Sequence, residues 1–353
     1  MDLKEMAQKA AQVRASDIFL KVDSQPLMRL NGKVENLDSS AKLTAEDTES
    51  LAYSIMSHDQ IGRFERRHEL DLAFTIEGVA RFRANVYKQR GTIGLVLRVI
   101  PLEIYTLEDL GMPKVVGDLA TKRQGLVLVT GPTGCGKSTT LAAMINLING
   151  RRRCNIVTVE DPIEFIHPDK KACVNQREIG IDTDSFTDAL KYIVRQSPDV
   201  ILIGEMRDVE TMNVALAASE TGHLVFSTVH TCSASETLDR IMNMFPPHDK
   251  PQVCLRLSIA LQGIASQKLI PRADTAGRIA AVEIMIANPT ISKLIEEGRS
   301  GQLYQAISEG DFWGMQTMNQ CLVKYAKDGI ISEEEALANA GNVTELKQMM
   351  RRQ

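Results

Sequence analysis

The segment GPTGCGKS, residues 131–138, has the residue types and spacing of a loop that wraps around phosphate groups. It follows the apolar run LVLV and precedes TTLAAMINLI, a segment of helical composition. Glycines let such a loop curl until its backbone N–H groups point at phosphate oxygens, and the following helix N-terminus adds its dipole. Lys137 is expected to reach the β- and γ-phosphates of ATP, and the Ser138 hydroxyl to bind Mg²⁺. The candidate nucleotide-binding residues of this loop are Pro132, Thr133, Gly134, Cys135, Gly136, Lys137, Ser138 and Thr139.

A nucleotide-bound magnesium ion also needs a carboxylate at the end of a neighbouring strand. The segment PDVILIGE supplies Glu205 behind four apolar residues and a glycine. In parallel sheets, ligands lie outside the carboxyl ends of the strands. Glu205 is therefore predicted to lie near the phosphates and to hold Mg²⁺ together with Ser138, partly through water. Asp208 is expected to cap the following helix instead.

The segment TVEDPIEF, residues 158–165, places further carboxylates behind an apolar run. In one interpretation Asp161 is an N-cap, Pro162 the first helical residue, and Glu164 completes a capping box. In the other, one of the glutamates orients and deprotonates the attacking water. We expect a division of labour in which Asp161 and Pro162 shape the turn, Glu160 ends the strand beside the nucleotide, and Glu164 is the candidate base.

Two histidines, His223 and His230, lie at the ends of the strand-like segment HLVFSTVH. Alternation along a strand places them on opposite faces, so together they are a poor metal-binding pair. Only His230 lies at the carboxyl end, where it could sense the γ-phosphate. A purely structural role is the alternative for a single histidine.

Two arginines interrupt the apolar pattern of strand-like segments near the N-terminus. In ARFRANVY apolar and polar residues alternate, which places Arg83 on the polar face, and in LVLRVI the apolar run is broken by Arg98. Surface arginines are commonly only solvated. A guanidinium also suits the charge that develops on a transferring γ-phosphate. Both residues are therefore candidate arginine fingers offered to a neighbouring subunit.

The order of these patterns predicts an α+β domain, a linker, an α/β domain and a helical C-terminal part. The first part mixes helix-like and short strand-like segments, and Pro101 and LGMPK mark the linker. The third part, after the linker, repeats a strand, a turn and a helix, which is typical of a parallel-sheet α/β domain. The predicted boundaries are 1–100, 101–114, 115–270 and 271–353.

The composition of the chain limits its class. With 353 residues, 44% of them hydrophobic and 24% charged, it is typical of a globular protein with two or three domains. The net charge of -4 disfavours general nucleic-acid binding. No segment of the sequence has the apolar core of a signal peptide or the length of a membrane span. The six cysteines include no C-x-x-C pair, which argues against a zinc site and for a reducing, cytoplasmic location.

Several long motifs follow one another in the order of a single family: ARFRANVY, GPTGCGKSTT, TVEDPIEFIH, PDVILIGEMRD, ETGHLVFSTVHT and GMQTMNQCL. In these, and over nearly its whole length, the chain resembles the secretion and type IV pilus motor ATPases of the PilT/PilU twitching-motility type. The resemblance implies a PAS-like N-terminal domain, a RecA-like P-loop ATPase domain, and a homohexameric ring with nucleotide between the two domains.

The resemblance also implies roles for individual residues. The catalytic group comprises the base Glu164, the supporting acid Glu160, the Walker B acid Glu205, the γ-phosphate sensor His230, and the arginine fingers Arg83 and Arg98. Arg207 and Arg240 are further candidates for phosphate or interdomain contacts.

Within the family, the chain lacks the four-cysteine zinc motif and longer N-terminal extension of extension and type II secretion motors, so it resembles a retraction motor. The retraction subgroup's AIRNLIRE segment is replaced by TISKLIEE, and GIDTDSF and AVEIM resemble the accessory PilU branch. GEMRD and HLVFSTVHT favour the PilT-like branch.

The expected function is therefore ATP hydrolysis with Mg²⁺ that drives pilus retraction and twitching motility. The resemblance implies a location at the cytoplasmic base of the pilus, a platform protein of the inner membrane as partner, and a paralogous retraction ATPase as a second partner. The alternatives are a PilU-like accessory ATPase, a pilus-extension or secretion ATPase, a RecA-like nucleic-acid motor, and a scaffold that binds nucleotide without hydrolysing it.

Overall fold

The computed structural model describes residues 2–13, 15–30, 32–37, 41–100 and 103–351. Pro101, which the sequence assigns to the linker, lies outside the described residues. The chain divides into two compact units. The first comprises Met1–Glu103 with Glu164–Ile166, and the second Ile104–Ile163 with His167–Gln353.

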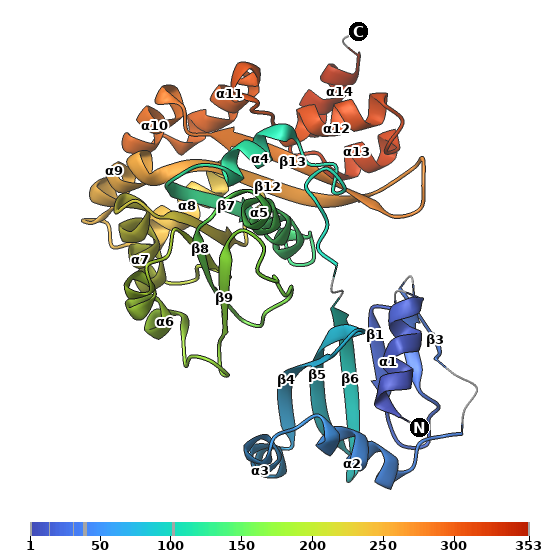
Figure 1. The fold of residues 1–353 in the computed structure, drawn as a ribbon. Coiled ribbons are helices and arrows are strands. Elements are labelled where there is room, and N and C mark those ends of the chain that lie inside the picture. The colour runs from blue at the N-terminus through green and yellow to red at the C-terminus, as the bar shows by residue number, and fades with distance from the viewer. Residues whose placement is uncertain (1, 14, 31, 38–40, 101–102, 352–353) are drawn as a thin grey trace. The chain divides into compact units, whose positions relative to one another are not determined.

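The first unit is built on an antiparallel sheet with the strand order β3-β2-β1-β6-β5-β4 (Figure 1). Its strands are β1 (Asp17–Leu20), β2 (Leu27–Leu30), β3 (Lys33–Asn36), β4 (Glu69–Ile76), β5 (Ala80–Gln89) and β6 (Thr92–Ile100). Its helices are α1 (Leu3–Gln12), α2 (Ala45–Ser54) and α3 (His58–Arg67). The alternation predicted for β5 is confirmed, because Phe82, Ala84 and Val86 are buried while Arg83 is exposed.

The second unit is built on a sheet with the strand order β13-β12-β7-β11-β10-β8-β9. All pairs of neighbouring strands are parallel except the hairpin of β12 and β13. The strands are β7 (Gly125–Thr130), β8 (Asn155–Glu160), β9 (Cys173–Glu178), β10 (Val200–Ile203), β11 (Leu224–Val229), β12 (Leu261–Pro271) and β13 (Arg278–Ile286). The expected α/β class is therefore confirmed for this part of the chain.

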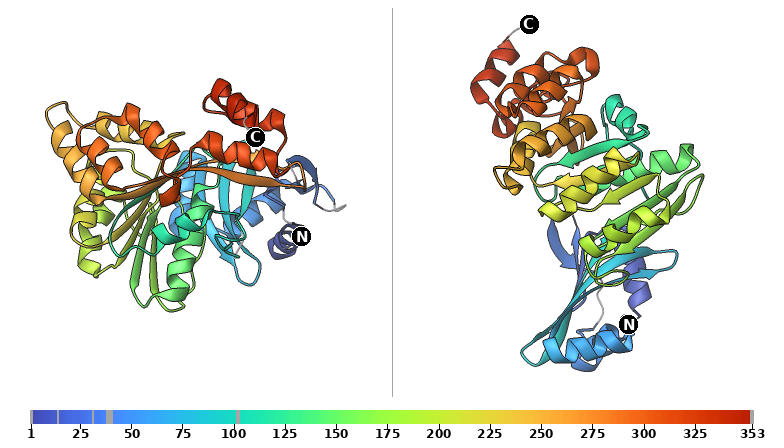
Figure 2. Two further views of the ribbon diagram at one scale, coloured as in Figure 1. Left: turned by 90° about the horizontal axis from the view of Figure 1, so that it is seen from above. Right: turned by 90° about the vertical axis from the view of Figure 1, so that its left-hand side faces the viewer.

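Helices cover both faces of this sheet (Figure 2). Leu126 and Leu128 of β7 pack into a core with residues of α6 to α10, whereas Val127 and Val129 face the opposite way, into a core with α4 and α5. All four side chains are buried, as expected of a central parallel strand covered on both faces. The helices are α4 (Lys114–Ala120), α5 (Lys137–Arg151), α6 (Phe186–Ile193), η1 (Val194–Gln196), α7 (Val209–Glu220), α8 (Ala234–Met244), α9 (Lys250–Ala260) and α10 (Pro289–Glu296).

The C-terminal part differs from the sequence prediction at its start. It was expected to be helical from residue 271 on, but residues Arg278–Ile286 form β13, which pairs with β12. The remaining elements are η2 (Ser300–Gln302), α11 (Leu303–Ser308), η3 (Asp311–Trp313), α12 (Met318–Lys327), α13 (Glu333–Asn339) and α14 (Val343–Arg351). The last three helices share a small core with Ile270, Ile279 and Ala281 of the hairpin. Among the described helices, none is both long and apolar enough to span a bilayer.

Candidate functional site

The glycine-rich loop connects β7 to α5, as predicted. Its glycines 131, 134 and 136 have φ values of 143°, 78° and 89°, which favour glycine. A Cβ atom on Gly131 would lie 2.3 Å from the backbone oxygen of Gln267 and 2.5 Å from Cys135 Sγ, so no larger residue fits there. The loop leads into the open N-terminus of α5, where Gly136 provides no side-chain cap. This end of the helix leaves backbone N–H groups for an anion.

Lys137 folds back over the loop. Its Nζ donates hydrogen bonds to the carbonyl oxygens of Gly131 at 2.9 Å and Pro132 at 3.1 Å. The same atom lies 3.4 Å from Nδ1 of His230, at the end of β11. The residue is only 8% exposed, so its charge is held among these polar atoms.

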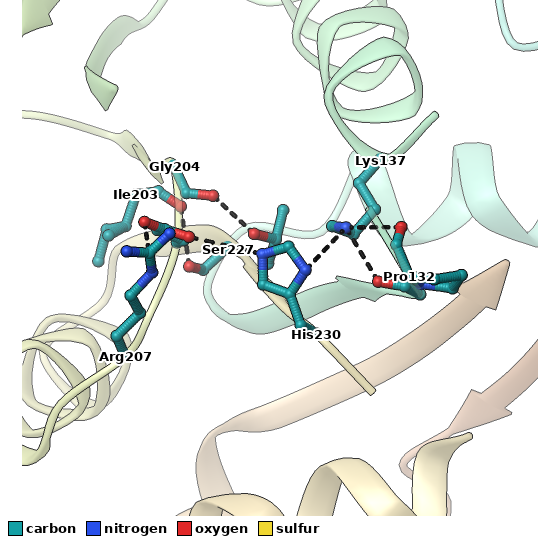
Figure 3. A network of polar contacts seen from close by, with 10 residues as sticks. Pro132, Lys137, Ile203, Gly204, Arg207, Ser227 and His230 are labelled. Carbon is teal, nitrogen blue, oxygen red and sulfur yellow. Dashed lines mark hydrogen bonds and ion pairs between the residues drawn. The ribbon is translucent and has the colours of Figure 1, made fainter. Parts of the chain in front are cut away.

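Glu205 lies one residue beyond Gly204, which follows β10, and links two further side chains. Its Oε1 lies 2.7 Å from Nε of Arg207, and its Oε2 lies 3.5 Å from Nε2 of His230. With Lys137 these residues form a continuous chain of contacts, which we call the polar chain (Lys137, His230, Glu205 and Arg207; Figure 3). The structure thus brings together the lysine of the loop and two side chains that the sequence placed at carboxyl ends of neighbouring strands.

Hydroxyl groups of β11 fix the end of β10 that carries Glu205. Ser227 Oγ donates to the carbonyl oxygen of Ile203 at 2.8 Å, and Thr228 Oγ1 donates to that of Gly204 at 2.7 Å (Figure 3). Gly204 itself approaches β8 closely, since a Cβ atom there would lie 3.4 Å from Cα of Glu160. These contacts hold the three strand ends in one place.

Glu160 is the last residue of β8 and is half-buried. Its Oε1 accepts hydrogen bonds from Thr158 Oγ1 at 2.7 Å and from Gln176 Nε2 at 3.1 Å. Gln176 belongs to β9, a strand that the sequence analysis did not predict. These two neutral donors help to orient the carboxylate, which suits a supporting acid.

The helix-start interpretation of TVEDPIEF is wrong. Residues 161–172, all of them described, contain no helix. The chain bends at Asp161 and Pro162, as the turn interpretation expected, and is then bonded to β9: the Ile163 amide donates to Glu178 Oε2 at 3.2 Å, and the His167 amide to Gln176 Oε1 at 2.8 Å. These amides find partners in β9 instead of in a helical turn. Glu164 is exposed on this segment.

Glu164, Arg83 and Arg98 all belong to the first unit. Arg83 of β5 and Arg98 of β6 are direct neighbours across the strand pair, and both are exposed. Nε of Arg98 lies 3.2 Å from Oδ1 of Asp17, which also pairs with Arg29. Their catalytic roles stay predictions.

The remaining predicted residues lie on the loop or on α8. Pro132, Thr133 and Gly134 are exposed at the tip of the loop, and Ser138 and Thr139 are half-buried in the first turn of α5. Arg240 is exposed on α8, and no contact places it in the polar chain. Burial raises the pKa of Cys135, outweighing the nearby Lys137 ammonium, so Cys135 stays a neutral thiol.

Nδ1 of His223 lies 2.9 Å from the carbonyl oxygen of Ala218, near the end of α7. His223 and His230 lie just beyond opposite ends of β11, and their placement on opposite faces of the strand stays a prediction. Among the described residues there is no cluster of three or more His, Cys, Asp or Glu that could hold a metal ion by itself.

Sequence reasoning missed two buried polar residues in the β12–β13 hairpin. Gln267 is bonded to the glycine-rich loop, and Oε1 of Glu283 accepts a hydrogen bond from the Ala234 amide at 2.8 Å, at the start of α8. Burial raises the pKa of Glu283 above its usual value. The bond from the Ala234 amide and one from the Met318 amide oppose this shift but do not cancel it. The signal available in the sequence was the presence of polar residues inside apolar runs: Ser266, Gln267 and Lys268 in IASQKLI, and Glu283 in AAVEIMI.

A glycine-rich phosphate loop between a parallel strand and a helix, with a carboxylate behind a neighbouring strand, defines an α/β protein of the P-loop class. The family model of the Type II/IV secretion system proteins matches residues 1–306. The chain belongs to this family, and its expected resemblance to the type IV pilus retraction ATPases is confirmed by the following relatives.

The type IV pilus retraction ATPase PilT of Pseudomonas aeruginosa is 46% identical over 340 residues, which cover 96% of this chain and 98% of that protein. The type IV pilus ATPase PilU of the same organism is 39% identical over 351 residues, covering 99% and 92%. A crystal structure of the pilus retraction motor PilT with bound ADP matches with a TM-score of 0.93 and 45% identity, over 99% of this chain and all 100% of that one.

Proposed function

We propose that the chain is a magnesium-dependent ATPase that works as a homohexameric motor of type IV pilus retraction. The observation that carries this proposal is the polar chain, which joins the lysine of a phosphate loop to a histidine and a carboxylate at the ends of two neighbouring strands. Relatives named as retraction ATPases, and a similar structure with bound ADP, support the same function. The ring would lie in the cytoplasm at the inner-membrane base of the pilus, on a platform protein.

Phosphate binding would begin at the N-terminus of α5. The ammonium of Lys137 now donates to two loop carbonyls, and in the proposed mechanism it exchanges these partners for the β- and γ-phosphate oxygens of ATP. The exchange keeps the buried charge paired throughout. His230, which already contacts Lys137, would then register whether a γ-phosphate is present.

Magnesium would be held by the Ser138 hydroxyl and, partly through water, by Glu205. The donor set fits a nucleotide-bound ion, because Mg²⁺ keeps several waters and takes one or two protein oxygens plus phosphate oxygens. It does not fit an all-protein metal site, in keeping with the lack of a ligand cluster among the described residues. Bound there, the ion would supply positive charge against the phosphates.

Water activation is assigned to Glu164, with Glu160 in support. Glu164 is exposed and can accept a proton from water, whereas Glu160 is already oriented by Thr158 and Gln176. Arg83 and Arg98 would reach the nucleotide of a neighbouring subunit and stabilise the charge of the transferring γ-phosphate. Hydrolysis would then be coupled to assembly of the ring.

The two units would be a PAS-like domain and a RecA-like ATPase domain, joined by the linker over 101–114. The antiparallel sheet of the first unit and the helix-covered, mostly parallel sheet of the second support this assignment. The proposed core of the ATPase domain runs from 115 to 270, followed by the C-terminal part.

A PilU-like accessory ATPase is the second candidate function. PilU of P. aeruginosa is 39% identical over 99% of this chain, and the segment TISKLIEE lacks the arginines of the retraction subgroup. An accessory motor would work beside a paralogous retraction ATPase. The effect of deleting it on twitching would then depend on whether that partner is present.

Deletion with complementation in the source organism tests the direction of the motor. Loss of twitching with excess surface pili supports retraction, whereas bald cells would indicate an extension motor and contradict the proposal. If deletion leaves twitching normal while a paralogue is present, and twitching is lost only when the paralogue is absent, the accessory function is identified.

Purified rings should hydrolyse ATP only with Mg²⁺, and Lys137→Ala should abolish this activity. DNA-stimulated, salt-sensitive turnover would instead indicate a nucleic-acid motor.

A further inference from the structure

Gln267 of β12 lies behind the glycine-rich loop and is only 1% exposed. Its amide makes two buried hydrogen bonds to the loop and to the helix that follows. Nε2 donates to the carbonyl oxygen of Cys135 at 2.6 Å, and Oε1 accepts from the hydroxyl of Thr140 at 2.9 Å. Gln267 is 132 positions from Cys135 and 127 from Thr140. One side chain from a distant strand therefore contacts both the end of the loop and the start of the helix.

The bond to Cys135 fixes the direction of one peptide group. A trans peptide is planar, so its N–H points opposite to its C=O. The Cys135 carbonyl is aimed at Gln267, and the Gly136 N–H of the same peptide is consequently aimed to the other side. Phosphate loops bind anions through such inward N–H groups. Gln267 thus determines where one of the anion-binding donors points.

The surroundings of Gln267 leave this peptide little freedom to turn. A Cβ atom on Gly131 would lie 2.3 Å from the Gln267 backbone oxygen, and one on Gly136 would lie 3.2 Å from its Nε2. One residue earlier, Thr130 Oγ1 donates to Ser266 Oγ at 2.8 Å where β7 enters the loop. The loop is therefore packed against β12 on the side to which the Cys135 carbonyl points.

An amide is the group that suits this position. It offers a donor and an acceptor on one planar end, and both are used here. A carboxylate could still accept from Thr140 but would face the Cys135 carbonyl with no proton to give. An apolar side chain would leave the Cys135 carbonyl and the Thr140 hydroxyl without partners.

We propose that Gln267 is a positioning residue that keeps the phosphate loop in its anion-binding shape by orienting the peptide between Cys135 and Gly136. The proposal rests on the proposed nucleotide binding at this loop. It acts on binding rather than on the chemical step, because Gln267 orients backbone donors that contact phosphates in substrate and transition state alike.

The test compares variants that remove one bond each, with ADP as a probe that needs no hydrolysis. Gln267→Met removes both bonds, Gln267→Glu removes the bond to Cys135, and Thr140→Val removes the bond to the helix. Gln252→Leu, at an exposed position of α9, is the matched control. Affinity for ADP is measured by calorimetry on the full chain, and KM and kcat are measured with Mg-ATP.

We expect Gln267→Met and Gln267→Glu to weaken ADP binding by about tenfold or more, as loss of a buried hydrogen bond predicts. KM should rise by a similar factor while kcat at saturation changes by less than about threefold. Thr140→Val and Gln252→Leu should bind ADP as the unchanged protein does, within about threefold.

Two results would overturn the proposal: unchanged ADP affinity in Gln267→Met, or a loss in Thr140→Val as large as in Gln267→Met. The second would mean that Gln267 acts by holding the helix and not the peptide. If Gln267→Met fails to fold, the ADP affinity of Gln267→Glu, which keeps the Thr140 bond, takes its place. Unchanged affinity in that variant would then overturn the proposal. Failure of the unchanged protein to bind ADP would contradict the proposed function itself and is thereby distinguished from failure of this inference.

Discussion

Lys137 Nζ and His230 Nδ1 lie 3.4 Å apart, and this contact determines which nitrogen of the imidazole carries the proton. An ammonium group can only donate, so Nδ1 accepts and the ring proton lies on Nε2. That nitrogen faces Glu205 Oε2 at 3.5 Å. His230 therefore lies between an ammonium group on one side and a carboxylate on the other, which makes it the middle member of the polar chain.

Replacing His230 by alanine should interrupt this chain. We expect kcat for Mg-ATP to fall by about tenfold to hundredfold, because a group that orders the charged side chains around the γ-phosphate is lost. ADP has no γ-phosphate, so its affinity should change by less than about threefold. Steady-state kinetics and calorimetric titration check the two expectations, and His223→Ala serves as a control for the loss of a histidine that flanks the other end of β11. A kcat equal to that of the control would refute the sensor role.

Glu164→Gln should remove catalysis without disturbing the fold. Glu164 is exposed and caps no helix, so the substitution should change the free energy of unfolding by no more than about 0.5 kcal/mol. A general base contributes about 10² to 10⁴ in rate, and kcat should fall accordingly while ADP is still bound. Rings of the variant should form normally, as size-exclusion chromatography with light scattering can check.

Glu334→Gln, an exposed carboxylate of α13, is the matched control for Glu164→Gln. If both variants hydrolyse ATP at the same rate, the base must be another residue, and Glu160 would be the next to test.

The elements that position the site were predictable where one local signal dominated. The glycine-rich loop, β7, β8, β10 and β11 follow from apolar runs that end in glycine, a carboxylate or a histidine. Strand β9 was missed because CVNQRE has no apolar pattern and lies at the edge of the sheet. The helix-start interpretation of Asp161 fails because the amides that would have started the helix are bonded to β9.

Gln267 shows a second limit of local patterns. Its bond to Cys135 joins residues 132 positions apart, and no short segment of the sequence signals that contact. The sequence could identify the residues that meet a ligand by their type and spacing. It could not identify the residues that hold those groups in place, because they are defined by the packing of distant strands.

The ion pairs of Asp17 separate stability from catalysis in the first unit. The Asp17 side chain is 9% exposed and pairs with both Arg98 and Arg29, whereas the side chain of Arg98 is 68% exposed. Asp17→Asn should therefore lower the free energy of unfolding by about 1 to 3 kcal/mol, because two arginines lose their shared carboxylate. Arg98→Gln should cost about 1 kcal/mol or less. Calorimetric unfolding of the full chain measures both.

For ATP hydrolysis by assembled rings, Arg98→Gln should have the larger effect and Asp17→Asn the smaller one. If Arg98 is an arginine finger, Arg98→Gln lowers kcat by about tenfold or more, since such fingers contribute up to several orders of magnitude. Asp17→Asn should retain most of the activity below its unfolding temperature. Equal activity of Arg98→Gln and the unchanged ring would assign Arg98 to the pair with Asp17 alone.

His167 should make the stability of the second unit depend on pH. The side chain is buried, and Nδ1 has no hydrogen-bond partner among the described residues. Burial, with a smaller contribution from Lys170, lowers the pKa of His167 from 6.5 to about 4. Between these two values the unfolded chain binds a proton that the folded chain does not, so stability rises with pH through this window and is lost as the pH falls from 6.5 towards 4.

The size of this effect follows from the same shift. Each pH unit in the window changes the free energy of unfolding by up to about 1.4 kcal/mol, so His167 contributes on the order of 2 to 4 kcal/mol in total. Urea unfolding at pH 7.0 and 4.5 should show a smaller difference in His167→Leu than in the unchanged protein. His248→Gln, which removes an exposed histidine, should leave the difference as it is. Since carboxylates titrate in all three proteins alike, a His167→Leu variant with the full pH dependence would mean that His167 is protonated in the folded chain.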